Sequence, residues 1–278
     1  MIKIYFSNSW GEEPDKLLRR YSRQTPNCSG VWKNIIGTTN IREADYCILL
    51  EDNFFQQDFD KSKIIYVKRE PSFIQNISPS LIPYRNIIHW EEKHCGITWW
   101  IDKTYDELKQ LKYPEKTKLI SCVSSSKHYQ RNELIKKIIL NNKNIDLYGK
   151  GHDKLIYGDS YKGELNYNGN CKVKGMIDYK FSICLENSQE RNYWTEKLAD
   201  AYLSWSLPIY FGCSNIQIYF PKNSYRVIDI NNDFNLLNII REEIDINSLA
   251  QARDKILDEY NIWEVVRKKI MEINNVCN

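Results

Sequence analysis

A strand end and the helical turn that follows it carry four side chains that could bind a charged ligand. A buried-looking strand closes with Glu186, and Asn187 follows it. Thr195 can cap a helix that has Glu196 and Lys197 in its first turn. Open α/β sheets bind ligands at such strand ends, and helix N-termini attract anions. The pattern predicts a site for an anion such as a phosphate.

The same turn has a simpler interpretation that needs no ligand. Glu196 alone interacts favourably with the positive end of the helix dipole, whereas Lys197 does not unless an anion faces it. A Lys197 that points into solvent would avoid that conflict. The residue types leave both interpretations open.

Elements of two kinds alternate along the chain to position these residues. Short β-branched and aromatic runs predict strands, and amphipathic patterns between them predict helices. Continuous apolar strands separated by such helices favour parallel sheets covered on both faces, so we expect two α/β domains that face each other across a cleft. The predicted strands are 2–6, 44–50, 63–70 and 85–90, then 118–125, 144–149, 179–186, 206–212 and 225–230, with helices at 14–22, 130–141 and 195–205.

The polar segment 102–118, closed by Pro114, could join the two sets of strands. We therefore expect one domain over 1–105, a second domain over 106–245 that carries the candidate anion site, and a C-terminal helix within 246–278. Apolar residues at helical spacing predict that this helix, over 247–273, packs back on the body. A helix that contacts a membrane surface through Arg267, Lys268 and Lys269 is the alternative.

Composition excludes several classes of protein. The 278 residues are 42% hydrophobic and 27% charged, as in ordinary globular domains, and the net charge of +3 is spread along the chain, so nucleic-acid binding is not indicated. Eight cysteines without a CxxC pair indicate a reduced, cytoplasmic setting rather than zinc or disulfides. No apolar run approaches the roughly 20 residues of a membrane span.

The amino-acid sequence of the central segment adds a family resemblance to these physical signals. ENS at 186–188, followed by YWTEKLADAYLSWSLPIYFG at 193–212, closely resembles the fucosyltransferase signature of glycosyltransferase family 10, and the match continues through NIQIYFPKNSYRVIDI at 215–230. The resemblance implies a GT-B architecture of two Rossmann-like halves with a cleft between them. It implies that the C-terminal half holds a GDP-sugar and the N-terminal half receives the acceptor. It also implies inversion at the anomeric carbon with no metal and no other cofactor.

The resemblance also assigns the donor phosphates to two cations. The segment VSSSKHYQRN at 123–132 is similar to a family stretch whose arginine contacts the pyrophosphate, which places Arg131 in that role. Ser125 stands where the family usually has asparagine, a difference that concerns local loop contacts. Arg131 and Lys197 together would neutralise the GDP leaving group, as a divalent metal does in other transferases.

Further positions match the pocket for the ribose and the transferred sugar. They are Asn187, Tyr193 and Glu196, and Glu186 at the strand end is assigned to donor binding with them. A carboxylate near the anomeric carbon favours an oxocarbenium-like transition state, so Glu196 is also a catalytic candidate.

Inversion in one displacement requires a base that takes the proton of the attacking hydroxyl. The strand predicted at 63–70 ends in Glu70-Pro71, which resembles the family's glutamate at the end of an N-domain strand. Pro71 ends the strand and favours an extended Glu70. Glu70 is therefore the candidate base, although a glutamate at a strand end is most often simply solvated.

Acceptor recognition has the weaker signals. Trp10 and Trp32 lie in predicted loops, where an exposed indole can stack on a sugar face, and ordinary packing is the alternative. Asp58-Phe59-Asp60 has the Asp-x-Asp spacing of metal-dependent transferases but precedes a strand instead of following one, so no metal site is expected. Gly149-Lys150-Gly151 could form a loop that approaches the donor closely.

These features favour an inverting, metal-independent fucosyltransferase that uses GDP-L-fucose and a glycan acceptor. The resemblance implies an α-1,3 or α-1,4 linkage to N-acetylglucosamine or glucose of a surface polysaccharide or lipopolysaccharide. The same chemistry with another GDP-linked sugar, and a non-catalytic glycan-binding protein, are the alternatives. Eukaryotic members of the family carry an N-terminal membrane anchor that is absent here, so a bacterial or viral cytoplasmic enzyme is expected.

Overall fold

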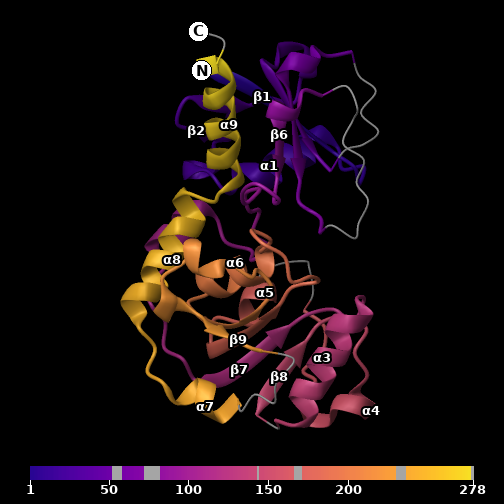
Figure 1. The fold of residues 1–278 in the computed structure, drawn as a ribbon. Helices are drawn as coiled ribbons and strands as arrows, with labels where there is room; N and C mark the ends of the chain where they lie inside the picture. Colours follow the sequence, from indigo (N-terminus) through magenta and orange to yellow (C-terminus); the bar gives the residue numbers. More distant parts are fainter. Residues whose placement is uncertain (52–57, 72–81, 143, 166–170, 230–235, 277–278) are drawn as a thin grey trace. The chain divides into compact units, whose positions relative to one another are not determined.

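The chain folds into two compact units, each built on its own sheet (Figure 1). A computed structural model describes residues 1–51, 58–71, 82–142, 144–165, 171–229 and 236–276. Unit 1 contains Met1–Thr98, Lys103–Gln110 and Leu257–Asn278, and unit 2 contains Trp99–Asp102 and Leu111–Ile256. The predicted α/β class with two mostly parallel sheets is confirmed.

Unit 1 has a six-stranded sheet in the order β2-β3-β1-β4-β5-β6. All neighbouring strands are parallel except β2 and β3, which form an antiparallel hairpin. The strands are β1 (Ile2–Asn8), β2 (Val31–Trp32), β3 (Ile35–Gly37), β4 (Tyr46–Leu50), β5 (Ile64–Lys68) and β6 (Ile87–His89). The sheet extends from β1 to both sides, so the carboxyl ends of β1 and β4 flank a point where the strand order reverses. Open α/β sheets bind ligands at such a point.

Two helices far apart in sequence cover one part of this sheet. In Figure 1, α9 (Ile262–Val276) lies beside β1 and α1 (Pro14–Ser22). The indole N–H of Trp263 donates to the carbonyl of Tyr21 at 2.9 Å, and its ring meets Phe6 edge-on at 5.3 Å. Each of these three side chains is at most 3% exposed, and burial of one such side chain stabilises the fold by roughly 2 to 3 kcal/mol.

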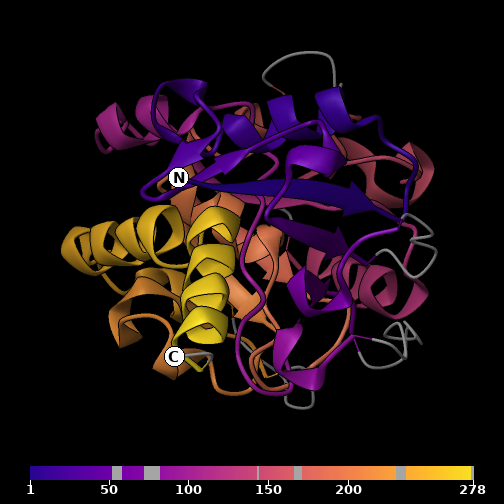
Figure 2. The same ribbon diagram turned by 90° about the horizontal axis from the view of Figure 1, so that it is seen from above.

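The single helix predicted over 247–273 is wrong, because the structure has two. Figure 2 draws α8 (Ile246–Asp258) and α9 as separate coils. Asn261 lies between them, forms a bridge with Ile97, and accepts the backbone N–H of Trp263 through its side chain at 3.1 Å. The side-chain amide of Asn261 also donates to the carbonyl of Gln24 at 2.7 Å. This capping ends one helix and starts the next.

The C-terminal segment packs on the protein, as expected. Six of the apolar side chains of the predicted helix are fully buried and Met271 is partly buried; the six are Leu249, Ile256, Ile262, Trp263, Val266 and Ile270. Two of the cations proposed for a membrane surface have partners within the protein, because Arg267 pairs with Glu264 at 2.8 Å and Lys269 donates to the carbonyl of Arg85 at 3.0 Å. Among the residues that the structure describes, no helix is long and apolar enough to cross a membrane.

Unit 2 has a five-stranded, fully parallel sheet in the order β11-β10-β9-β7-β8. The chain runs from β7 outward to β8, then returns to place β9 on the other side of β7. The carboxyl ends of β7 and β9 therefore flank the reversal point of this sheet. The strands are β7 (Lys118–Val123), β8 (Ile145–Tyr148), β9 (Tyr179–Leu185), β10 (Leu207–Phe211) and β11 (Arg226–Val227).

Helices follow the two strands at that point. Helix α3 (Tyr129–Leu140) follows β7 and buries an isoleucine face, Ile135, Ile138 and Ile139. Helix α6 (Glu196–Leu203) follows β9 and buries Leu198, Ala201 and Tyr202. The remaining helices are α2 (Tyr105–Gln110) of unit 1 and α4 (Lys154–Tyr157), α5 (Cys171–Lys174) and α7 (Leu236–Arg241) of unit 2. Short 3-10 turns lie at 26–28, 41–43, 61–63, 84–86, 158–160, 216–218 and 222–224.

Candidate functional site

Arg131 lies at the reversal point of the unit 2 sheet, in the first turns of α3. Its guanidinium donates to the side-chain oxygen of Asn187, just past β9, and to the carbonyl of Ser125 at 3.2 Å, just past β7. The side chain is 8% exposed, and burial lowers its pKa from the ordinary value. Because Ser125 contributes its carbonyl here, the departure from asparagine at this position leaves the contact with Arg131 intact.

Glu186 lies beneath the first turn of α6. Its carboxylate accepts the backbone N–H and the hydroxyl of Thr195, each at 2.7 Å, and lies 3.4 Å from the Nζ of Lys197. The carboxylate is fully buried, and a Cβ at Gly212 would lie 2.4 Å from its Cγ. Glu186 therefore contacts Thr195 and Lys197 from within the protein, and its assignment to donor binding stays a prediction.

Lys197 is the second cation at this point. Its Nζ lies 3.3 Å from Glu196 and 3.0 Å from the hydroxyl of Thr195, the residue that caps α6. Burial alone would lower the pKa of Lys197, but Glu196 and Glu186 outweigh that effect and raise it. The side chain is only 18% exposed, so the interpretation in which Lys197 points into solvent is wrong.

The structure brings both cations to one place. Arg131 and Lys197 are close enough for their like charges to interact, and each also interacts with Glu186 and Glu196. Burial alone would raise the pKa of Glu196, but Lys197 and a further lysine, Lys172, bring it to about 2. Two cations and two carboxylates meet where two strands end, an arrangement that can receive an anionic ligand in place of one internal ion pair.

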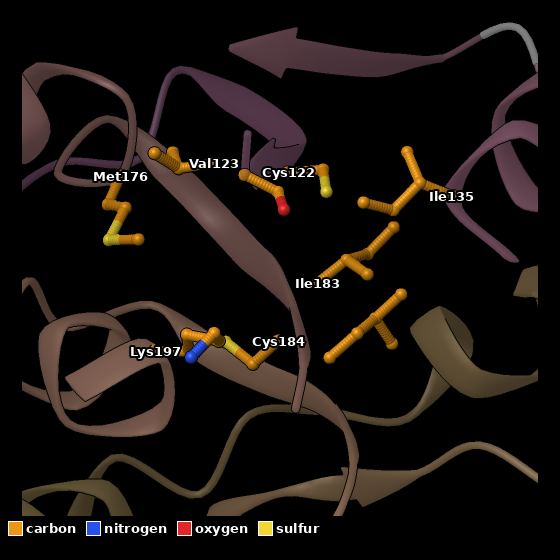
Figure 3. A pocket seen from close by; sticks show the side chains of 9 residues that line it. Cys122, Val123, Ile135, Met176, Ile183, Cys184 and Lys197 are labelled. Atoms are coloured by element: carbon orange, nitrogen blue, oxygen red, sulfur yellow. The ribbon is translucent and has the colours of Figure 1, made fainter. Parts of the chain in front are cut away.

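A small cavity of about 10 Å³ lies behind Lys197. Figure 3 shows the Lys197 side chain next to Cys184, with Cys122 and Ile183 on another part of the wall. Burial raises the pKa of both thiols, and that of Cys122 reaches about 12, so they line the cavity as neutral groups. Lys197 thus borders a mostly apolar cavity, while its ammonium lies among the charged groups of the site.

The loop between β9 and α6 is held in one shape by amide pairs. Asn192 adopts a left-handed backbone with φ of 59°, and its side-chain oxygen accepts from Asn215 at 2.8 Å and from Tyr219 at 2.7 Å. Trp194 is 2% exposed and packs on Phe220, with 4.9 Å between ring centroids. Tyr193, expected in the sugar pocket, is 3% exposed and interacts with Arg131 from within the protein.

In unit 1, Glu70 lies just past the carboxyl end of β5, as predicted. Its backbone is fixed at both ends, because its N–H donates to Glu51 at 3.0 Å and its carbonyl accepts from the indole of Trp90 at 3.0 Å. Glu51 was missed in the sequence. It follows β4 directly, is 7% exposed with φ of 53°, and also accepts the N–H of Arg69, so it holds the β5 end in place. A glutamate directly after an apolar strand was the available signal.

The two tryptophans proposed for the acceptor differ. Trp10 is 45% exposed at the carboxyl end of β1, with the guanidinium groups of Arg20 and Arg69 at 5.5 Å and 5.8 Å from its ring centroid. Trp32 is not in an exposed loop, as we expected, but in β2. It is 5% exposed, and its indole N–H donates to Glu264 at 2.8 Å, so it serves packing and offers no face to a sugar.

The other two motifs have local roles. Asp60 caps a short turn by accepting the N–H of Ser62 at 2.9 Å, and Asp58 is exposed, while residues 52–57 before this motif lie outside the described residues. Gly149 follows β8 and approaches the loop after β7 so closely that a Cβ there would lie 1.9 Å from the carbonyl oxygen of Ser124. The close approach that the structure shows is therefore to the segment that contacts Arg131, and an approach to the donor stays a prediction.

A family model described as glycosyltransferase family 10 (fucosyltransferase) C-term matches residues 113–274, more than half of the chain. An alpha-(1,3)-fucosyltransferase, FucT, of Helicobacter pylori is 41% identical over 76 residues, which cover 27% of this chain and 16% of that protein. An alpha-(1,4)-fucosyltransferase of Arabidopsis thaliana is 50% identical over 54 residues, with 19% and 13% covered. The 4-galactosyl-N-acetylglucosaminide 3-alpha-L-fucosyltransferase 9 of Mus musculus is 30% identical over 146 residues, with 49% and 35% covered.

These matches span about a third or less of the length of each relative. A crystal structure of an alpha1,3-fucosyltransferase with GDP aligns with 99% of this chain and 89% of its own, at 17% identity and a TM-score of 0.49. The family match covers the whole of the charged cluster around Arg131 and Lys197.

Proposed function

Because this chain belongs to glycosyltransferase family 10, we propose that it transfers L-fucose from GDP-L-fucose to a hydroxyl of a glycan, with inversion and without a metal ion. An α-1,3 linkage to N-acetylglucosamine or glucose of a surface polysaccharide or lipopolysaccharide, made in the cytoplasm, is the specific form of this proposal. The observation that carries it is the meeting of Arg131 and Lys197 at the reversal point of the unit 2 sheet.

The two cations suit a diphosphate leaving group. As the bond from the sugar to GDP breaks, negative charge grows on the departing phosphate oxygens, and cations already in place stabilise it without rearrangement. Arg131 is anchored through Asn187 and Ser125, and Lys197 through Thr195, so both are preorganised. In the free protein, Glu186 and Glu196 offset the positive charge of the two cations. The bound diphosphate would take over that role.

Glu70 is the proposed base. In an inverting displacement the acceptor oxygen attacks the anomeric carbon, the bond to GDP breaks, and the hydroxyl proton passes to a carboxylate. Glu70 has a backbone fixed by Glu51 and Trp90 and a partly exposed side chain, so its carboxylate is available on a rigid strand end. Trp10, at the end of β1, is the proposed stacking surface for the acceptor.

The experiment measures GDP affinity by calorimetry and GDP release from GDP-fucose with N-acetyllactosamine in EDTA. We expect Lys197→Met to weaken GDP binding by about 10- to 100-fold, because it removes one charge-assisted contact. Lys180→Met is the matched control, since Lys180 is exposed on the same strand that leads to the site. Glu70→Gln should abolish turnover and leave GDP affinity unchanged.

Three results would contradict the proposal. Unchanged GDP affinity in Lys197→Met would show that Lys197 does not bind the diphosphate. Loss of turnover in EDTA would show that the reaction requires a metal ion. GDP binding without turnover on any acceptor would favour a glycan-binding protein. A panel of GDP-sugars in the same assay separates fucose transfer from transfer of another sugar.

A further inference from the structure

His128 reaches the candidate site from the position just before α3, and no motif in the sequence indicated it. The guanidinium of Arg131 donates to the side-chain oxygen of Asn187. The side-chain nitrogen of Asn187 lies 3.4 Å from the Nε2 of His128. Because a guanidinium has only N–H donors, it fixes the orientation of the Asn187 amide, whose nitrogen then donates to Nε2. His128 is therefore neutral in the free protein, with its proton on Nδ1.

The stability of α3 does not explain a histidine at this position. His128 is the N-cap residue of α3, and its side chain makes no capping hydrogen bond within the described part of the chain. Serine, threonine, aspartate and asparagine are preferred at an N-cap because their side chains bond to the first turn. The imidazole instead contacts Asn187, the residue that also holds Arg131. This contact points to a role at the site.

The surroundings of His128 oppose a positive charge on its ring. Burial lowers the pKa of His128 from its ordinary value of 6.5, and so do the positive charges of Arg131, Lys197 and Lys127. These three cations belong to α3, to α6 and to the loop after β7. The first turn of α3 has no acidic residue, so the positive end of its dipole acts in the same direction. A bound anion opposes all of these charges and raises the pKa of His128.

We propose that His128 is a further donor-binding residue, which takes up a proton when the diphosphate of the donor binds and then donates Nε2–H to that diphosphate. The inference rests on the proposed function, in which Arg131 and Lys197 hold the diphosphate. The proton comes from water and adds to the lone pair of Nε2, and no bond of the donor changes. A protonated Nε2 cannot accept from Asn187, because two donors then face each other. The pair separates, and the amide N–H of Asn187 also becomes available to the ligand.

The charge balance of the site favours one more cation when the donor is bound. Arg131 and Lys197 carry two positive charges, and Glu186 and Glu196 offset them in the free protein. The diphosphate of a nucleotide sugar adds two negative charges, which these four groups leave unbalanced. A permanent third cation would increase the repulsion in the free protein. A histidine supplies positive charge only while the ligand is present.

Nuclear magnetic resonance of the histidine rings tests the proposal directly. The chain has four histidines, and the signal that is lost in His128→Gln assigns His128. Without ligand we expect a titration midpoint below 6.5 and the nitrogen shifts of a ring with its proton on Nδ1. With saturating GDP-fucose and no acceptor, the midpoint should rise by about one pH unit or more. GDP-fucose is the probe because each of its phosphates is esterified and has no ionisation near neutral pH.

The pH dependence of GDP-fucose affinity, measured by calorimetry, is the second readout. Because binding takes up a proton, affinity rises as the pH falls through the raised midpoint of the complex, and it levels off below the midpoint of the free protein. For the wild type we expect Kd to fall about tenfold between about pH 7.5 and about pH 5.5, and for His128→Gln less than about twofold. Gln130→Ala, at an exposed position in the first turn of α3, should match the wild type.

Two results would overturn the inference. One is a His128 midpoint that stays in place or falls when GDP-fucose binds. The other is the same pH dependence of affinity in wild type and His128→Gln, which would assign the proton to another group such as Glu186, whose pKa burial raises. If His128→Gln does not fold, variants of His89, His94 and His152 assign the wild-type spectrum by exclusion. A wild-type protein that binds no GDP-fucose would instead refute the proposed function.

Discussion

Gly149 shows how one residue without a side chain supports the candidate site. It follows β8 with φ of 135°, and a Cβ would lie 1.9 Å from the carbonyl oxygen of Ser124, a backbone atom that cannot rotate away. That carbonyl accepts from His152 at 2.8 Å, and the next one, of Ser125, accepts from Arg131. The loop after β7 is therefore fixed between β8 and Arg131.

We expect Gly149→Ala to displace that loop and to weaken GDP binding along with stability. The clash should lower the free energy of unfolding by about 1 to 3 kcal/mol beyond the cost of the positive φ. Gly163→Ala is the matched control, because Gly163 also has a positive φ, of 98°, but open space where the Cβ would be. Urea denaturation and calorimetry with GDP measure both effects. Equal behaviour of the two variants would contradict the steric argument.

At the residue scale, local signals predicted only part of the site. The cap at Thr195 and the first-turn position of Glu196 and Lys197 follow from the helix-start pattern, so they were predictable. Lys172 and Asp200 meet only because α5 and α6 pack together, and no spacing in the sequence indicates that contact. The burial of Trp32 by Glu264 of the last helix was unpredictable for the same reason.

At the scale of elements, Asn261 determines the residue at which helix α9 begins. The Asn261 side chain is fully buried and bonds to three backbone groups, namely the N–H of Trp263 and the carbonyls of Gln24 and Leu257. One residue thus ends α8, caps α9 and ties both to the segment after α1.

We expect Asn261→Ala to lower the free energy of unfolding by about 2 kcal/mol, since it removes a helix cap and leaves buried backbone groups without partners. Asn275→Ala is the control, because Asn275 is exposed within the same helix and its substitution should change stability by less than about 0.5 kcal/mol. Chemical denaturation followed by circular dichroism measures the difference. A loss in Asn275→Ala as large as in Asn261→Ala would show that the cap is not the cause.

The regular elements were predictable because their periodicity is strong. The helix at 14–22 has its predicted bounds, and the nine predicted strands are present with ends that shift by a few residues. The hairpin of β2 and β3 was missed, because strands of two and three residues carry no measurable alternation. They are defined by their pairing with each other and by the pairing of β3 with β1. The break at Asn261 was missed because the apolar spacing continues through it.

At the scale of the whole molecule, unit 1 is completed by residues from the end of the chain. Glu264 of α9 accepts from Trp32 at 2.8 Å and from Arg267, and it forms a salt bridge with Lys33 at 3.0 Å. Burial alone would raise the pKa of Glu264, but hydrogen bonds from Arg267, Trp32 and Lys33 lower it to about 2 from an ordinary value of 4.5. A carboxylate with a depressed pKa stabilises the fold above its unfolded pKa.

We expect this contribution to be lost as the pH falls from about 4.5 to about 2, and to amount to roughly 2 to 3 kcal/mol. Glu264→Gln should therefore be less stable than the wild type at pH 7 and should approach it near pH 2. Stability curves in urea at several pH values test this, with Glu259→Gln, an exposed position in the same unit, as the control. A stability difference between wild type and Glu264→Gln that stays constant with pH would contradict the assignment.

Leu257–Asn278 belongs to unit 1, so unit 1 can be completed only after these residues have been synthesised. As the polypeptide leaves the ribosome, Phe6 and Tyr21 emerge long before Trp263, the residue that covers them. The second unit, which ends at Ile256, can complete its sheet earlier. The sheet of unit 1 thus stays partly uncovered until α9 has been translated, and its apolar side chains are exposed to aggregation during that time.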